Sequence, residues 1–383
     1  MSRSHGLQAL LLVLLAALAG CSGSEAGGGG ALPAATSTYL HAKHAPSGSY
    51  LYVENQNSTI SAFSVAKNGA LSEISGSPFA SETNGPSLFS IAVNPKGPDL
   101  YVTGTVSQNL AIFSIGSGGG LTLVSDSTSA GDGANFPLLS EHDKRLYVVN
   151  VANGGAVDAF DLVKNGSRAK PIAGSPFSVT CPGFCDPNPG DAVIGGSYLY
   201  TVDTYGWYVS TFSISRSGAL TELSSYATGY GPAQAVMTPK GTELYVTNGA
   251  QGSVSGYSVA AGVLTPLMGS PFSAGATPLG IVMTPNGKNL YVANQGDGTI
   301  SGYSIGSGGA LTALSGSPFA DGSGTSPTAV VIDRDGKHLF VTNDSTDAIV
   351  VYAIDGSGAI KQVAGSPFAE KSGAGGPQGL ALF

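Results

Sequence analysis

Three neighbouring segments of the chain gather aromatic and acidic side chains. Trp207, the only tryptophan of the protein, lies in "VDTYGWYV" (202–209). Aromatic rings beside carboxylates can stack on sugar rings and accept hydrogen bonds from sugar hydroxyls. The candidate ligand-binding residues are Trp207, Tyr205, Tyr208, Tyr230, Asp186, Asp191 and Asp203. The alternative is that these rings pack the long insertion around them.

Motifs of other chemistries give no catalytic residue. "GYSIG" (302–306) matches G-x-S-x-G, but it lies in a predicted strand and not at a strand-to-helix elbow. The sequence contains no phosphate-binding loop and no dinucleotide fingerprint. Catalytic residues therefore stay unknown, and we predict no cofactor and no metal site.

The three cysteines indicate an exported protein. Cys181 and Cys185 lie in "CPGFC", where an oxidising compartment would join them as a disulfide. Metal binding is the alternative, but two thiolates supply only half of a tetrahedral zinc site. The third cysteine, Cys21, lies close to the N-terminus.

The N-terminal region has the pattern of a targeting segment. Residues 1–20 combine Arg3 with a short apolar stretch, which predicts a signal peptide. "LAGC" (18–21) resembles the lipobox of bacterial lipoproteins, in which the cysteine is lipidated; an ordinary secretory signal is the alternative. We expect an exported protein, lipid-anchored through Cys21 to the membrane of the bacterial cell envelope, with residues 21–37 as a flexible tether.

The composition favours short strands joined by tight turns. The chain has 383 residues, 57 of them glycine, and only 10% are charged. The formal net charge of -8 makes nucleic acid an improbable partner.

A repeat of 45 to 53 residues runs through the chain. The "LYV" segments, with their variants, place aromatic residues at Tyr52, Tyr101, Tyr147, Tyr200, Tyr245, Tyr291 and Phe340. Such a period in short alternating strands predicts an all-β, seven-bladed β-propeller over residues 38–383, with four-stranded antiparallel blades. We expect a monomer.

"GSPF" occurs five times, at the predicted end of an outer strand. The copies are residues 76–79, 174–177, 269–272, 316–319 and 365–368. Proline has no N–H, so it prevents an exposed edge from pairing with another chain. The phenylalanine can pack on the next blade, and we therefore interpret the motif as structural.

Seven prolines precede the predicted innermost strands. They are Pro86, Pro137, Pro189, Pro232, Pro278, Pro327 and Pro377. The last introduces "QGLALF", which we expect to close the ring as the inner strand of the first blade. The segment 39–53 competes for that place, but its first residues are polar and lack the matching proline.

"LYVTN", "LYVAN" and "LFVTN" resemble the YVTN-type propeller repeats. These are similar to the bacterial lactonase-like propellers, including the propeller type of 6-phosphogluconolactonase. The resemblance extends over residues 39–383 and implies the fold more strongly than the reaction. The enzymes of that family use polar and basic residues in the channel mouth. No local motif in this sequence identifies a counterpart of any of these residues.

The loops of an up-and-down sheet alternate between the two faces of the ring. One face, which we call the mouth, receives eleven acids and a single cation, Lys371. The acids are Glu54, Glu82, Asp132, Asp186, Asp191, Asp203, Asp297, Asp321, Asp344, Asp347 and Glu370. The opposite turns hold most of the lysines and every arginine that follows the signal segment. A phosphorylated sugar acid ordinarily needs arginine or lysine, so the mouth suits a neutral glycan or a cationic partner better.

Two hypotheses follow for the function. The first is a non-catalytic propeller that binds a glycan or another envelope protein at its mouth. The alternative is a lactone hydrolase similar to 6-phosphogluconolactonase.

Overall fold

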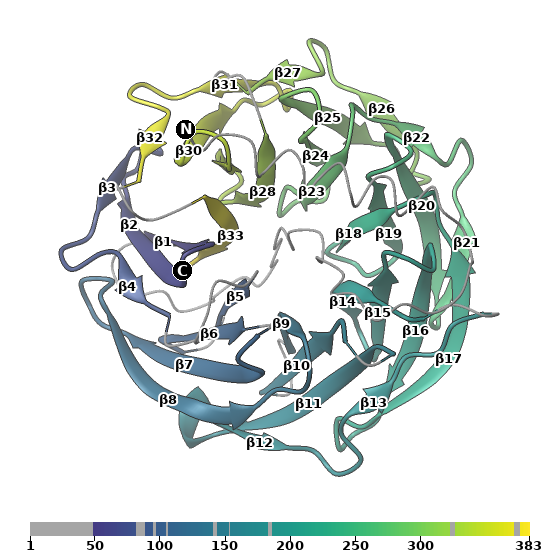
Figure 1. The fold of residues 1–383 in the computed structure, drawn as a ribbon. Coiled ribbons are helices and arrows are strands. Elements are labelled where there is room, and N and C mark those ends of the chain that lie inside the picture. Colours follow the sequence, from purple (N-terminus) through teal and green to yellow (C-terminus); the bar gives the residue numbers. More distant parts are fainter. Residues whose placement is uncertain are drawn as a thin grey trace, which may run out of the picture.

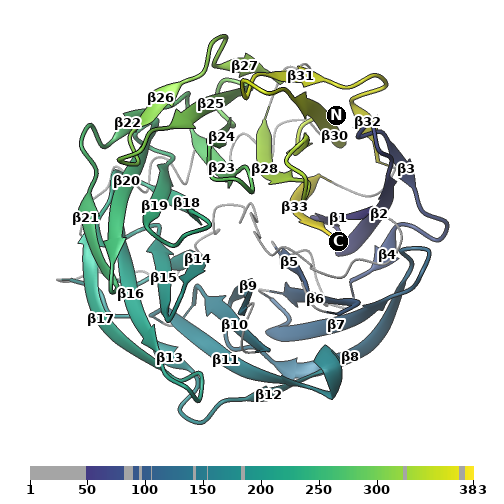
Figure 2. The same ribbon diagram turned by 180° about the vertical axis from the view of Figure 1, so that it is seen from behind.

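The structure is a closed ring of seven β-sheets around a central axis (Figures 1 and 2). It is a computed structural model, and it describes residues 49–81, 89–94, 97–104, 106–140, 144–152, 154–182, 186–321, 326–370 and 376–383. The predicted signal segment and Cys21 lie outside these residues. Among the described residues, no helix has the length and apolar character needed to cross a bilayer.

Each blade is an antiparallel sheet, and in blades 2 to 7 the strands run in chain order from the axis outward; in blade 1 the last strand of the chain is the innermost. Blade 1 contains β33 (Pro377–Leu382), β1 (Ser49–Asn55), β2 (Thr59–Val65), β3 (Leu71–Glu73) and β4 (Phe79–Ala80). Blade 2 contains β5 (Phe89–Val93), β6 (Asp99–Gly104), β7 (Asn109–Ile115) and β8 (Leu121–Ser129). Blade 3 contains β9 (Ala134–Ser140), β10 (Arg145–Asn150), β11 (Ala156–Val163), β12 (Arg168–Pro171) and β13 (Phe177–Ser178), with a short 3-10 turn at Lys164–Gly166.

The remaining blades follow the same plan. Blade 4 contains β14 (Pro189–Gly195), β15 (Tyr198–Asp203), β16 (Tyr208–Ile214) and β17 (Leu220–Ala227). Blade 5 contains β18 (Pro232–Met237), β19 (Glu243–Asn248), β20 (Ser253–Ala260), β21 (Val263–Pro266) and β22 (Phe272–Ser273). Blade 6 contains β23 (Pro278–Met283), β24 (Asn289–Asn294), β25 (Thr299–Ile305), β26 (Leu311–Ala313) and β27 (Phe319–Ala320). Blade 7 contains β28 (Pro327–Ile332), β29 (His338–Asn343), β30 (Ala348–Ile354), β31 (Ile360–Gln362) and β32 (Phe368–Ala369).

The C-terminal strand closes the ring, as predicted. β33 pairs with β1 in the register Leu51 to Leu382 and Val53 to Leu380. The first blade is therefore built from both ends of the propeller, and its β1–β33 ladder joins blade 7 to blade 1 along the chain.

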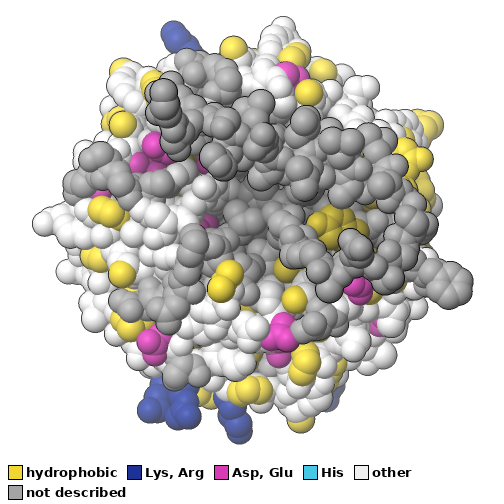
Figure 3. All heavy atoms as spheres, in the orientation of Figure 1, with side chains coloured by type: hydrophobic (Ala, Val, Ile, Leu, Met, Phe, Trp, Pro, Cys, Tyr) yellow, Lys and Arg dark blue, Asp and Glu magenta, His cyan; other side chains and the backbone are white. Residues whose placement is uncertain are grey.

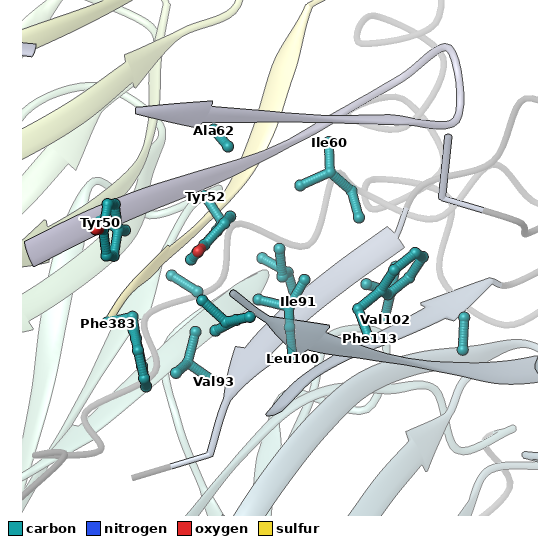
Figure 4. Close-up of a cluster of buried hydrophobic side chains, with 13 residues drawn as sticks. Tyr50, Tyr52, Ile60, Ala62, Ile91, Val93, Leu100, Val102, Phe113 and Phe383 are labelled. Carbon is teal, nitrogen blue, oxygen red and sulfur yellow. The ribbon is translucent and has the colours of Figure 1, made fainter. Parts of the chain in front are cut away.

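The second strands are apolar on both faces because a blade lies on each side of them. Tyr245 of β19 packs between blades 5 and 6, whereas Leu244 and Val246 pack between blades 4 and 5. Figure 4 shows the equivalent layer between blades 1 and 2, to which Tyr52, Leu100 and Phe113 contribute. Continuous burial explains why "LYV" does not alternate with polar residues.

The repeated tyrosine also ties its blade to the next one. Its hydroxyl donates to the carbonyl of a turn glycine in five pairs: Tyr52 to Gly119, Tyr101 to Gly166, Tyr147 to Gly218, Tyr245 to Gly309 and Tyr291 to Gly358. These glycines have a positive φ, which they adopt without the strain of a side chain. Five of the seven inter-blade joints therefore share the same pair of recurring residues, a tyrosine and a turn glycine.

GSPF divides the outer strand into two short pieces. In blade 5, β21 and β22 both pair with β20, and Ser270 Oγ lies between them. It accepts a hydrogen bond from the Gly256 N–H at 2.9 Å, and the serines of the other four motifs do the same. The serine thus replaces a ladder carbonyl, while Phe272 packs partly buried between blades 5 and 6.

The prolines fit the prediction in five blades and contradict it in one. β14, β18, β23, β28 and β33 begin at a proline. Pro137 lies inside β9, opposite Val148, because Ala134 occupies the first position opposite Asn150. A proline is tolerated there because an innermost strand has a free edge. Pro86 lies outside the described residues.

Candidate functional site

The strand register places the loops after the second strand and the loops between blades on one face, the mouth. Asn55 of β1 pairs with Pro377 and with Thr59, and Thr59 pairs with Ala80, so all these strand ends lie together. In the view of Figure 3, Asp and Glu side chains are spread over the face, and the Lys and Arg side chains in view lie at its outer rim. That distribution is the one predicted for the mouth.

Half of the ten predicted mouth acids that the structure describes are buried. Glu54, Asp191, Asp203, Asp321 and Glu370 are buried, whereas Asp132, Asp186, Asp297 and Asp347 are exposed and Asp344 is half-buried. Burial raises the pKa of Asp191 and of Glu370 to about 8, and Ala235 N–H opposes the shift for Asp191. Burial and the nearby Glu370 raise the pKa of Glu54 well above its ordinary value. The mouth therefore carries less negative charge at neutral pH than its sequence indicates.

Trp207 and Tyr230 form an aromatic pair on this face. Their ring centroids lie 4.6 Å apart and the planes meet at 82°. Trp207 is half-buried in the turn before β16, and Tyr230 is 57% exposed in the segment that enters blade 5. Tyr205, in the same turn as Trp207, is 42% exposed. The structure thus brings two of the predicted rings into contact and leaves all three accessible.

The other four predicted residues have different surroundings. Asp203 is buried and accepts hydrogen bonds from the N–H groups of Asn188 and Gly206 and from the Tyr208 hydroxyl. Asp191 is buried and accepts the Ala235 N–H at 2.7 Å. These carboxyls and the buried Tyr208 ring support the loops and do not reach a ligand on the surface. Asp186 is exposed, and a Cβ added at Gly154 of blade 3 would lie 3.6 Å from its Oδ1 atom.

The predicted disulfide falls partly outside the described residues. Cys185 belongs to residues 183–185, which the structure does not describe. The pairing of Cys181 with Cys185 therefore stays a prediction.

Asp344 is a site residue that the sequence did not single out. It follows β29, and its Oδ1 accepts hydrogen bonds from Gln378 Nε2 at 2.8 Å and Gln56 Nε2 at 3.2 Å. Burial and then the nearby Asp347 raise its pKa, against the effect of Gln378. The signal in the sequence was an aspartate directly after the "VTN" of blade 7, where blades 5 and 6 have glycine and glutamine.

Asp344 is suited to accept a proton. A half-buried carboxylate with a raised pKa binds a proton more tightly than an ordinary aspartate and still meets solvent. The side-chain amides of Gln56 and Gln378 hold Oδ1 of Asp344 in place. Among the described residues, no cluster of three or more His, Cys, Asp or Glu side chains could hold a metal ion.

A family model described as "Lactonase, 7-bladed beta-propeller" matches residues 40–162 and 195–374. Among solved structures, a candidate 6-phosphogluconolactonase from Bacteroides uniformis is 17% identical, with a TM-score of 0.74; the match covers 88% of this chain and 99% of that one. The periplasmic gluconolactonase PpgL of Pseudomonas aeruginosa is 18% identical, with a TM-score of 0.72 and coverage of 88% and 99%.

The same fold carries other chemistry as well. Hydrazine synthase from Kuenenia stuttgartiensis is 18% identical, with a TM-score of 0.58 and coverage of 84% of this chain and 96% of that one. At such identities the structural matches show the fold and not the reaction. None of the curated proteins compared with the chain matches it.

Proposed function

The chain belongs to the family of seven-bladed β-propeller lactonases, and we propose that it hydrolyses an uncharged sugar lactone at its mouth. The observation that carries this proposal is the position of Asp344, a half-buried carboxyl of raised pKa at the seam between blades 7 and 1. The family supplies the reaction class, and the printed names of the two lactonases above suggest a sugar-derived ring.

In the proposed reaction, Asp344 acts as a general base. Its carboxylate takes a proton from water while the water oxygen bonds to the lactone carbonyl carbon. The ring C–O bond then breaks, and the proton passes to the alkoxide that leaves, which gives the open hydroxy acid. Gln56 is exposed, and an amide NH2 has two donors, so it can hold Asp344 and also donate to the carbonyl oxygen.

The charges around Asp344 favour an uncharged substrate. Asp347 is exposed on the same face and lies near enough to raise the pKa of Asp344. A phosphate group at this position would meet like charge in a half-desolvated site. We therefore expect glucono-δ-lactone to be hydrolysed with a higher kcat/KM than its 6-phosphate.

The test is a stopped-flow proton-release assay on both lactones. Asp344→Asn removes the base but keeps the shape, and we expect kcat/KM to fall roughly 100-fold or more. Asp297→Asn, an exposed acid of blade 6, is the matched control and leaves turnover unchanged. Asp347→Asn keeps the base but removes the neighbouring charge, so the pH–rate profile shifts to lower pH. Full activity in Asp344→Asn would exclude this residue as the base.

The export and anchoring of the chain are a separate proposal that rests on residues 1–21. We propose lipidation at Cys21, which metabolic labelling with a fatty acid analogue would detect in the wild type and not in Cys21→Ser. A labelled Cys21→Ser protein, or an unlabelled wild type, would contradict it.

A further inference from the structure

The turn before the third strand has one backbone requirement in all seven blades. The residue directly before that strand has a left-handed backbone, with φ between 48° and 70°. These residues are Ser58, Gln108, Gly155, Trp207, Gly252, Gly298 and Asp347. In blades 2, 4, 5 and 6 its N–H bonds to the carbonyl four residues earlier, as Trp207 does to Asp203 at 3.1 Å. Every blade therefore needs a residue with a left-handed backbone at this position.

Three blades use glycine, the residue that adopts this conformation at least cost. Blade 4 uses tryptophan, although a bulky side chain at positive φ is disfavoured. Core packing of the Trp207 ring does not offset this backbone strain, because the ring belongs to none of the hydrophobic clusters between the described blades. Ser58, Gln108 and Asp347 also adopt a left-handed backbone here, but tryptophan is the bulkiest of the seven residues at this position. Keeping the bulkiest side chain at a strained position points to a role for that side chain.

The turn that carries Trp207 is held rigidly by its surroundings. The buried Asp203 carboxylate accepts the Gly206 N–H, and Thr228 N–H donates to the Trp207 carbonyl at 2.9 Å. On the facing segment, Tyr230 N–H donates to Gln251 Oε1 at 3.1 Å. Hydrogen bonds in the loops of blades 4 and 5 therefore hold the backbone that carries both rings, which lowers the entropy cost of binding.

We propose that Trp207, Tyr230 and Tyr205 form a binding platform for a neutral carbohydrate, separate from Asp344. The two contacting rings are nearly perpendicular, so they present apolar faces for the C–H groups of a sugar ring. The exposed tyrosines also bring phenolic hydroxyls to the same place. The exposed acids of the mouth repel anionic ligands, and the aromatic faces suit the C–H groups of uncharged sugars.

Because Trp207 is the only tryptophan, its fluorescence reports on this platform alone. We would titrate the protein with maltohexaose, cellohexaose and chitohexaose under selective tryptophan excitation. At least one of them should change the emission saturably. Tyr230→Ala should weaken that binding roughly tenfold. Leu223→Ala, an exposed apolar residue on the outer strand of the same blade, is the matched control and should bind as the wild type does.

Trp207→Gly separates a binding role from a structural one. It restores the residue found in blades 3, 5 and 6, so the melting temperature should stay the same or rise, while calorimetry detects no sugar binding. Asp344→Asn should still bind the sugar, and Tyr230→Ala should still hydrolyse a small lactone, which distinguishes this site from the proposed catalytic one. The platform is excluded if no hexasaccharide gives a saturable change, if only a cationic peptide such as oligolysine does, or if Trp207→Gly lowers the melting temperature.

Discussion

Glu370 faces the side-chain amide of Asn55 across the seam where the ring closes. Asn55 Nδ2 donates to Thr59 Oγ1 at 3.1 Å and to Ser61 Oγ at 2.9 Å. The other terminus of the amide then lies 3.2 and 3.1 Å from the two oxygens of Glu370. Two acceptors approach this closely when one of them carries a proton.

The opposite amide orientation, with Nδ2 donating to Glu370, would need Thr59 to donate to Asn55. The Thr59 hydroxyl already gives its only proton to Asn57 Oδ1 at 2.6 Å. Asn294 of blade 6 has the same arrangement as Asn55: its Nδ2 donates to Thr299 and Ser301, and its Oδ1 accepts the Gly275 N–H. We therefore infer that a protonated Glu370 replaces that backbone donor at the seam.

This inference predicts that the stability of the folded protein depends on pH through the seam between blades 7 and 1. Burial, with Asp347 and Glu73 nearby, raises the pKa of Glu370 to about 8, above the value near 4.5 of the unfolded chain. The folded state binds the extra proton, so the stabilisation is complete below about pH 4.5 and is lost as the pH rises through about 8. Urea unfolding at several pH values should show stability falling over this interval. Glu54, whose pKa is also raised, contributes in the same direction.

Glu370→Gln should flatten this dependence, because an amide donates to Asn55 at every pH. We expect the variant to gain on the order of 2 kcal/mol at about pH 9 and little at about pH 5. Asp297→Asn, which removes an exposed acid of the same face, should follow the wild-type curve. A Glu370→Gln protein that is less stable at all pH values would mean that Glu370 is ionised and that Asn55 has the other orientation.

The tyrosine ties allow a matched pair of substitutions. The buried Tyr245 hydroxyl donates to the Gly309 carbonyl at 2.6 Å, whereas the buried Tyr200 hydroxyl forms no hydrogen bond with the described residues. Tyr245→Phe should therefore cost about 1 kcal/mol of unfolding free energy. Tyr200→Phe should be neutral or slightly stabilising, because it removes an unsatisfied polar group. Equal losses in denaturant unfolding would show that the ties do not contribute as proposed.

The number of blades, the strand order and the closure by the C-terminal strand could be predicted from the sequence, because packing is recorded in residues that recur. Tyr245 and Gly309 have counterparts in other blades, and their spacing gives the period. The period also placed the mouth acids on one face. The prediction was wrong for Pro137, where a proline inside a strand was taken for one before it.

The exposure of individual acids could not be predicted in the same way. Asp203 and Asp186 both lie in mouth loops, but Asp203 is buried because backbone N–H groups of Asn188 and Gly206 satisfy it. Such partners leave no pattern in the sequence, since every residue except proline has an N–H. The left-handed position of Trp207 was hidden for a similar reason: its counterparts include Ser58 and Gln108 as well as glycine, so no single turn residue marks it.

The joint between blades 7 and 1 has no tyrosine at the recurring position and gives a last prediction. Phe340 replaces the tyrosine and has no hydroxyl to donate, and the His338 ring lies over Gly69 of blade 1. A Cβ at Gly69 would lie 2.6 Å from His338 Cδ2, and the φ of Gly69 is +82°. His338 is itself held by Asp333, at 2.6 Å from Nδ1 to Oδ2, so the ring cannot move aside without losing that bond.

Gly69→Ala should therefore destabilise the protein by about 2 kcal/mol or more, from backbone strain and from the contact with His338 together. Gly241→Ala is the matched control, because φ there is +68° and the added Cβ meets no atom within 4 Å. It should show only the strain, about 1 kcal/mol. In thermal unfolding, the difference between the two variants isolates the contact at the seam. A double variant, Gly69→Ala with His338→Ala, should show a smaller cost of the glycine substitution if the ring is its cause, and an unchanged cost would assign the whole effect to the backbone.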